Sequence, residues 1–252
     1  MCSGELLGGL YAFTFQIYGD FAGYSDIARG VSRMLGFNIM ENFNAPYLSR
    51  SVTEFWRRWH ISLSTWLRDY LYISLGGNRR GRLRTYLNLM LTMVLGGLWH
   101  GAAWTFVAWG AFHGLVLILH RIMLNGRKPP GMWPRAWGRR ATDVVKVLLT
   151  FHLVATAWIL FRAPSVPLAM QYLAGILRFD GIFRISAPVL FAAAVMFTLD
   201  LAQTWSGSHT WLVEEPRLGV IRYPLIQMLL LSVLGAAIAH IDTVTPFIYF
   251  QF

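Results

Sequence analysis

The feature that most constrains this chain is a long run without charge, because residues 85–120 contain no Asp, Glu, Lys or Arg. One straight helix of this length would extend about 54 Å, whereas the hydrocarbon core of a bilayer is only about 30 Å thick. Gly96, Gly97 and Gly101 interrupt the run and predict a break. We therefore expect two helices that return to the same side, with His100 at or near the turn between them.

The composition indicates that lipid is the surrounding solvent. Of the 252 residues, 56% are hydrophobic and 13% are charged, whereas soluble domains carry about 25% charged residues. These charges are too few to cover a globule, so the apolar surface must meet lipid. Further apolar stretches lie near residues 144–162, 187–204 and 223–241. The predicted fold class is therefore all-α, a polytopic integral membrane protein.

The net charge of +10 raises nucleic acid as a partner, but the excess is local. Two basic clusters flank apolar stretches, as the positive-inside rule expects of cytoplasmic loops, so no nucleic-acid partner is predicted. A phosphate-bearing acyl donor could still use these arginines. The clusters consist of Arg79, Arg80, Arg82 and Arg84, and of Arg127, Lys128, Arg135, Arg139 and Arg140.

Several segments outside the apolar stretches carry polar groups. Residues 18–26 are rich in glycine and contain several polar residues, so at membrane depth they would be buried among helices or line a cavity. Residues 38–52 predict a loop. Residues 53–75 predict one helix with too many charges for a lipid-facing span, so it lies at the interface or packs inside the protein. The single Cys2 excludes an internal disulfide and a cysteine-based zinc site.

Histidines are the strongest candidates for chemistry. His100 lies among small residues in an uncharged stretch, where a polar side chain is expensive unless it is paired or used. The alternative is a histidine that packs between helices and forms a hydrogen bond to a neighbouring helix. His60 lies in a segment of tryptophans and arginines, and an interfacial position beside lipid headgroups is its alternative. His113 follows His100 by thirteen residues, so in one helix it would point roughly 140° away and would not act from the same face.

Other common site types are not expected. The sequence contains no histidine–glutamate zinc pattern, so no metal is predicted. It also contains no nucleophile elbow and no phosphate-binding glycine loop. The remaining residues favour catalysis by an intramembrane histidine. Its imidazole would take a proton from a hydroxyl acceptor and so activate that hydroxyl for attack on an acyl group.

Long motifs then carry a resemblance to a known family. Residues 15–26 (FQIYGDFAGYSD), 54–70 (EFWRRWHISLSTWLRDY) and 97–102 (GLWHGA), together with residues 158–163 and 247–250, are similar to the membrane-bound O-acyltransferase family. The most similar branch is the alginate O-acetyltransferase membrane subunit, and the D-alanyl transfer protein of teichoic acid modification is a relative.

The resemblance implies roles for particular residues. His100 matches the essential catalytic histidine, and His60 matches the second histidine position of the family. The resemblance implies no tightly bound cofactor, and an acyl donor such as acetyl-CoA or an acylated carrier. Candidate substrate-binding residues are Trp99, Arg68, Asp69, Asn88 and His113.

The resemblance also implies a setting. Family members form a ring of transmembrane helices in the bacterial inner membrane, and this branch passes acetyl groups to an exported polysaccharide with periplasmic or membrane partner proteins. Because family members are about twice this long, we expect residues 1–252 to form a single transmembrane region, the C-terminal half of the ring, without the family's N-terminal helices.

Three hypotheses follow. The first is an O-acyltransferase that uses His100 as general base toward a polysaccharide hydroxyl, with alginate, cellulose and peptidoglycan all open as acceptors. The second is an inactive remnant or membrane scaffold that binds acetylation partners, which the missing helices would favour. The third is a transporter, because intramembrane polar residues also mark substrate paths.

Overall fold

A computed structural model describes residues 2–124 and 141–206, and every regular element within these ranges is helical. The chain divides into two compact units, Met1–Ala194 and Val195–Phe252. The helices and sites discussed below belong to the first unit, apart from α8 (Ala187–Ser206), which crosses the boundary between them. The all-α prediction is therefore confirmed for the described residues.

The first helix, α1 (Ser3–Met34), runs without interruption through the glycine-rich stretch. It begins at a capping box in which the Cys2 N–H donates to the Glu5 carboxylate at 3.1 Å. The expected burial of residues 18–26 holds for one face only. Tyr18 and Ser25 are buried, whereas Tyr24 is 58% exposed. This outcome follows from helical periodicity, which turns one face of the stretch toward the core and the other away from it.

The predicted single helix over residues 53–75 is wrong. The chain instead forms α2 (Val52–Trp56), α3 (Ile61–Trp66) and a π-helical turn, η2 (Leu67–Tyr72). His60 has a φ of 44°, a left-handed value that no α-helix contains, so the helix cannot continue through it. Burial of a charged side chain accompanies this break, because Arg58 is fully buried and donates to the Glu54 carboxylate at 2.7 Å.

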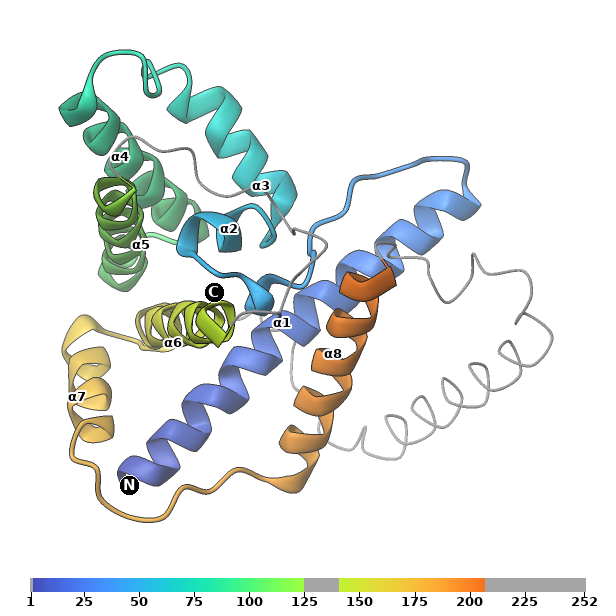
Figure 1. Ribbon diagram of the computed structural model, residues 1–252, viewed down its shortest axis with the longest axis vertical. Coiled ribbons are helices and arrows are strands. Elements are labelled where there is room, and N and C mark those ends of the chain that lie inside the picture. The colour runs from blue at the N-terminus through green and yellow to red at the C-terminus, as the bar shows by residue number, and fades with distance from the viewer. Residues whose placement is uncertain (1, 125–140, 207–252) are drawn as a thin grey trace. The chain divides into compact units, whose positions relative to one another are not determined.

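The predicted hairpin is confirmed. Helix α4 (Arg82–His100) and helix α5 (Trp104–Met123) pack along each other, and His100 is the last residue before the turn (Figure 1). Gly96 and Gly97 lie inside α4 rather than at the break. A Cβ at Gly97 would collide with the Phe106 carbonyl oxygen, so this glycine permits the close approach of the two backbones.

The stretch near residues 144–162 forms α6 (Ala141–Arg162), and residues 187–204 lie within α8. The stretch near residues 223–241 falls outside the described residues. In the described ranges, α5 and α6 are long and apolar enough to cross a membrane. The predicted loop contains a 3-10 turn, η1 (Pro46–Leu48).

One helix, α7 (Val166–Ile176), has no counterpart among the sequence predictions. It begins at Ser165, whose hydroxyl accepts the Leu168 N–H, and has Pro167 in its first turn. Both α6 and α7 pack against α1, and α6 also packs against α5 (Figure 1). These contacts bring the end of α4 into an aromatic core made by several helices.

Candidate active site

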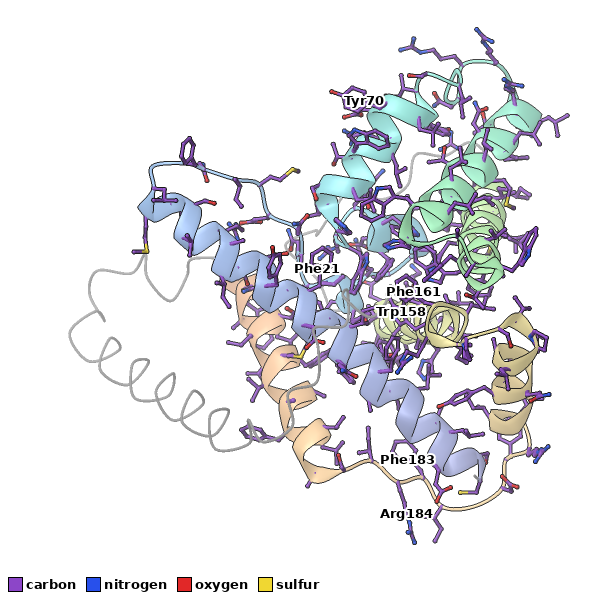
Figure 2. The ribbon with its side chains drawn as sticks, turned by 180° about the vertical axis from the view of Figure 1, so that it is seen from behind. Phe21, Tyr70, Trp158, Phe161, Phe183 and Arg184 are labelled. Carbon is purple, nitrogen blue, oxygen red and sulfur yellow. The ribbon has the colours of Figure 1, made fainter. Side chains whose placement is uncertain are left out.

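His100 ends α4 within a cage of aromatic rings. The centroid of its imidazole lies 5.0 Å from that of Trp99, 5.4 Å from that of Trp109 on α5, and 5.2 Å from that of Phe161 on α6. The rings of Trp109 and Phe161 meet the imidazole edge-on. Figure 2 labels Phe161 and Trp158 on α6, where the aromatic side chains of this cage gather. Three helices therefore fix the position of the imidazole.

His60 reaches the same place from the turn between α2 and α3. Its side chain is buried, and its ring lies edge-on to Phe21 of α1 at 4.7 Å and to Trp99 at 6.2 Å between centroids. The two imidazoles, His60 and His100, are close enough to interact electrostatically. The structure therefore brings together two histidines that are forty residues apart in the sequence.

Hydrogen bonds define the tautomer of His60. The Ser62 hydroxyl donates its single proton to Asn42 Oδ1 at 2.6 Å, and the Ser62 N–H donates to the same oxygen at 3.2 Å. His60 Nδ1 lies 3.3 Å from the Ser62 hydroxyl oxygen, which must therefore accept a proton from it. With the proton on Nδ1, the lone pair of His60 is on Nε2.

This arrangement suits proton transfer. Two neighbouring imidazoles do not easily carry a charge together, so one of them stays neutral and able to accept a proton from a hydroxyl. Trp99 contacts both rings and is itself 59% exposed. The pair is therefore held by a buried aromatic wall on one side and bounded by an exposed indole on the other.

His113 is a buried residue of α5. It is 1% exposed, and its ring centroid is 5.0 Å from that of Trp56 and 4.9 Å from that of Trp109. Neither ring nitrogen has a hydrogen-bond partner among the described residues. Trp109 contacts both His113 and His100, so one indole links the two histidines.

The remaining substrate-binding candidates occupy other environments. Arg68 and Asp69 form an ion pair of 2.6 Å on η2, with 60% and 40% of their side chains exposed. The hydrogen bond from Arg68 lowers the pKa of Asp69, and the same bond raises the pKa of Arg68. Asn88 is buried and donates to the carbonyl groups of Leu75 and Gly77 at 3.2 and 2.9 Å, so it holds the turn before α4.

The aromatic partners were not among the residues singled out from sequence. Phe21, Trp109 and Phe161 contact the histidine pair. Trp109 and Phe161 lie in apolar stretches, where an aromatic ring ordinarily indicates packing, and Phe21 lies in the glycine-rich stretch of residues 18–26. Within the described ranges, no group of three His, Cys, Asp or Glu side chains could hold a metal ion.

Comparison with known proteins gives the site a context. A family model described as the membrane-bound O-acyltransferase family matches residues 7–161. A probable alginate O-acetylase, AlgI of Azotobacter vinelandii, is 51% identical over 177 residues, which are 70% of this chain and 34% of that protein. The peptidoglycan O-acetyltransferase of Helicobacter pylori is 41% identical over 171 residues, 68% of this chain and 31% of that protein.

A more distant relative is the teichoic acid D-alanyltransferase of Streptococcus thermophilus. It is 34% identical over 173 residues, which are 62% of this chain and 40% of that protein. The matched part of this chain thus corresponds to about a third of the length of its alginate relatives. All three motifs that surround the histidine pair fall within the region matched by the family model.

Proposed function

Because this chain belongs to the membrane-bound O-acyltransferase family, we propose that it transfers an acyl group to a hydroxyl at the pair formed by His60 and His100. The observation that carries the proposal is that both imidazoles contact the same indole, Trp99, within one group of aromatic rings. A neutral imidazole beside an acceptor hydroxyl is the group that general-base acyl transfer requires.

In the proposed reaction, His100 takes the proton of the acceptor hydroxyl while its oxygen attacks the carbonyl carbon of the acyl donor. The bond between the carbonyl carbon and the donor's leaving group then breaks, and the proton passes to that leaving group. His60 lies beside His100, and Ser62 and Asn42 hold its proton on Nδ1. Its Nε2 lone pair is thereby available to orient the acceptor or to share the proton.

The names of the relatives suggest the substrates. Two of them are named as O-acetylating enzymes of alginate and of peptidoglycan, so the proposed acyl group is acetyl and the final acceptor an exported polysaccharide such as alginate. Acetyl-CoA or an acylated carrier is the proposed donor, without a tightly bound cofactor. We further propose a multi-pass location in the bacterial inner membrane and a role for periplasmic or membrane partner proteins.

The test measures acetyl esters on exported polysaccharide in an alginate-producing host that lacks its own related acetylase. The chain is expressed alone and joined to the N-terminal helices of an alginate relative, with His100 or His60 intact or changed to Ala. The matched control is His152→Ala. His152 lies on α6, is exposed, and forms a hydrogen bond of 2.8 Å with the Tyr11 hydroxyl of α1.

Esters that depend on His100 and His60 but not on His152 are the expected result. Acetylation that persists in His100→Ala would refute the assignment of the base. If no form of the chain restores esters while an intact relative does, the alternative of an inactive remnant or membrane scaffold is favoured instead.

A further inference from the structure

A cavity lies away from the histidine pair, between α1, α6 and α7. Its volume is about 670 Å³. Much of its wall is aliphatic, with Leu6 and Leu10 from α1, Ile159 from α6 and Leu168 from α7. Such a wall is suited to a hydrocarbon chain rather than to a small hydrated ion.

The same cavity is lined by two arginines and by no acidic residue. Arg162, the last residue of α6, lies over the Phe13 ring at 5.9 Å, and neither Arg162 nor Arg178 forms a salt bridge with a described residue. Asp180 interacts electrostatically with Arg178 and offsets part of its charge, so one carboxylate stands against two arginines. The cavity thus carries a net positive charge.

Trp158 forms a buried part of the cavity wall. It lines the cavity and is only 1% exposed, so its indole packs among the neighbouring side chains. Two arginines and aliphatic groups around one space together match an anion that carries hydrocarbon.

We propose that this cavity binds an anionic phospholipid, with the phosphate between Arg162 and Arg178 and an acyl chain along the aliphatic wall. Basic pockets between membrane helices bind anionic head groups in this way. The position on α6 agrees, because α6 is apolar enough to span a bilayer and Arg162 ends it, at the depth where head groups lie.

The leaflet follows from the distribution of charge. The basic cluster before α6 is expected on the cytoplasmic side, so a spanning α6 carries Arg162 to the opposite, outer leaflet. Phe161 and Trp158 of the same helical turn connect this cavity to the cage around His100. The lipid would therefore support the back of the wall that positions the proposed base, without entering the histidine pair.

The test uses the full chain, purified in a neutral detergent and titrated with phosphatidylglycerol, with bound lipid counted by native mass spectrometry. Two arginine contacts at about 1 kcal/mol each predict roughly thirtyfold weaker binding for Arg162→Gln/Arg178→Gln. The matched control, Arg184→Gln, also removes positive charge but lies outside the cavity. Figure 2 shows Arg184 on the segment after α7, where its side chain points away from the helices.

A second variant keeps the test independent of folding in the double mutant. Leu168→Glu places a carboxylate in the cavity wall at an exposed position, third in α7, where glutamate completes a capping box with Ser165. It should fold normally, pair with the arginines and weaken binding of phosphatidylglycerol at least tenfold. Phosphatidylcholine, which is neutral overall, should bind all forms weakly.

Unchanged phosphatidylglycerol binding in both cavity variants would overturn the proposal. Equal loss in Arg184→Gln would overturn it as well, because binding would then follow overall charge. Displacement of the lipid by millimolar inorganic phosphate would show a site for the anion alone and would likewise refute a lipid site.

Discussion

Replacing Gly97 with alanine tests whether close contact between α4 and α5 positions the histidine cage. A Cβ at this position would approach the Phe106 carbonyl oxygen to less than the 3.0 Å that real Cβ atoms essentially never cross, and it would also touch Gly110 of the facing helix at 3.4 Å. The obstacle is backbone on the partner helix, which no side-chain rotation can move aside. The two helices must therefore separate by roughly 1 Å, and overpacking of this kind costs about 1–3 kcal/mol.

The matched control is Gly23→Ala. Gly23 lies within α1, and a Cβ there would meet nothing within 4 Å, so alanine should stabilise the helix by about 0.5–1 kcal/mol. Thermal unfolding in detergent, followed by tryptophan fluorescence, should show Gly97→Ala roughly 2–12 °C below the parent and Gly23→Ala slightly above it. Acetylation should fall in Gly97→Ala, because His100 lies one turn further along the displaced helix. An unfolding temperature at or above that of the parent would refute the reasoning.

Three further predictions concern polar groups. Glu54→Gln should destabilise the protein by about 3 kcal/mol, because it leaves its buried arginine partner without a counter-charge, whereas Asp69→Asn, in an exposed pair, should be nearly neutral in the same denaturation assay. His113→Phe should raise the free energy of unfolding by about 1 kcal/mol, since it removes two unpartnered buried nitrogens; a clear loss would reveal a partner beyond the described residues. The Ser3 N–H lowers the pKa of Asp180, so protection of the first turn of α1 against hydrogen exchange should be complete above the ordinary aspartate pKa and be lost as the pH falls through the lowered value; protection that does not change with pH would contradict this.

The elements that follow from hydrophobicity could be predicted from the sequence. The uncharged run between residues 85 and 120 is too long for one span, and the structure contains the expected pair α4 and α5 with His100 at their turn. Helix α6 likewise corresponds to an apolar stretch. These elements were predictable because their length and burial depend on the character of many residues, so no single contact decides them.

Elements that depend on individual contacts could not be predicted in the same way. Helix α7 has Pro167 in its first turn, and its start depends on a serine cap. The aromatic cage also has no local signal, since Phe21, Trp109 and Phe161 come from three helices and meet only after packing. Periodicity indicates which face of a helix is buried but does not indicate which rings will meet there.

The break at residues 57–60 connects the failed prediction to the proposed chemistry. A continuous helix would have fixed His60 on a regular face, at a right-handed backbone angle. The left-handed φ of 44° instead ends α2 and turns the chain, while buried Arg58 holds this turn through the Asn44 carbonyl and Glu54. Backbone conformations of this kind cost about 1–3 kcal/mol and persist where surrounding contacts enforce them. We infer that the buried ion pair stabilises this turn so that His60 can contact Trp99 beside His100, and that a regular helix is interrupted at the position where the site forms.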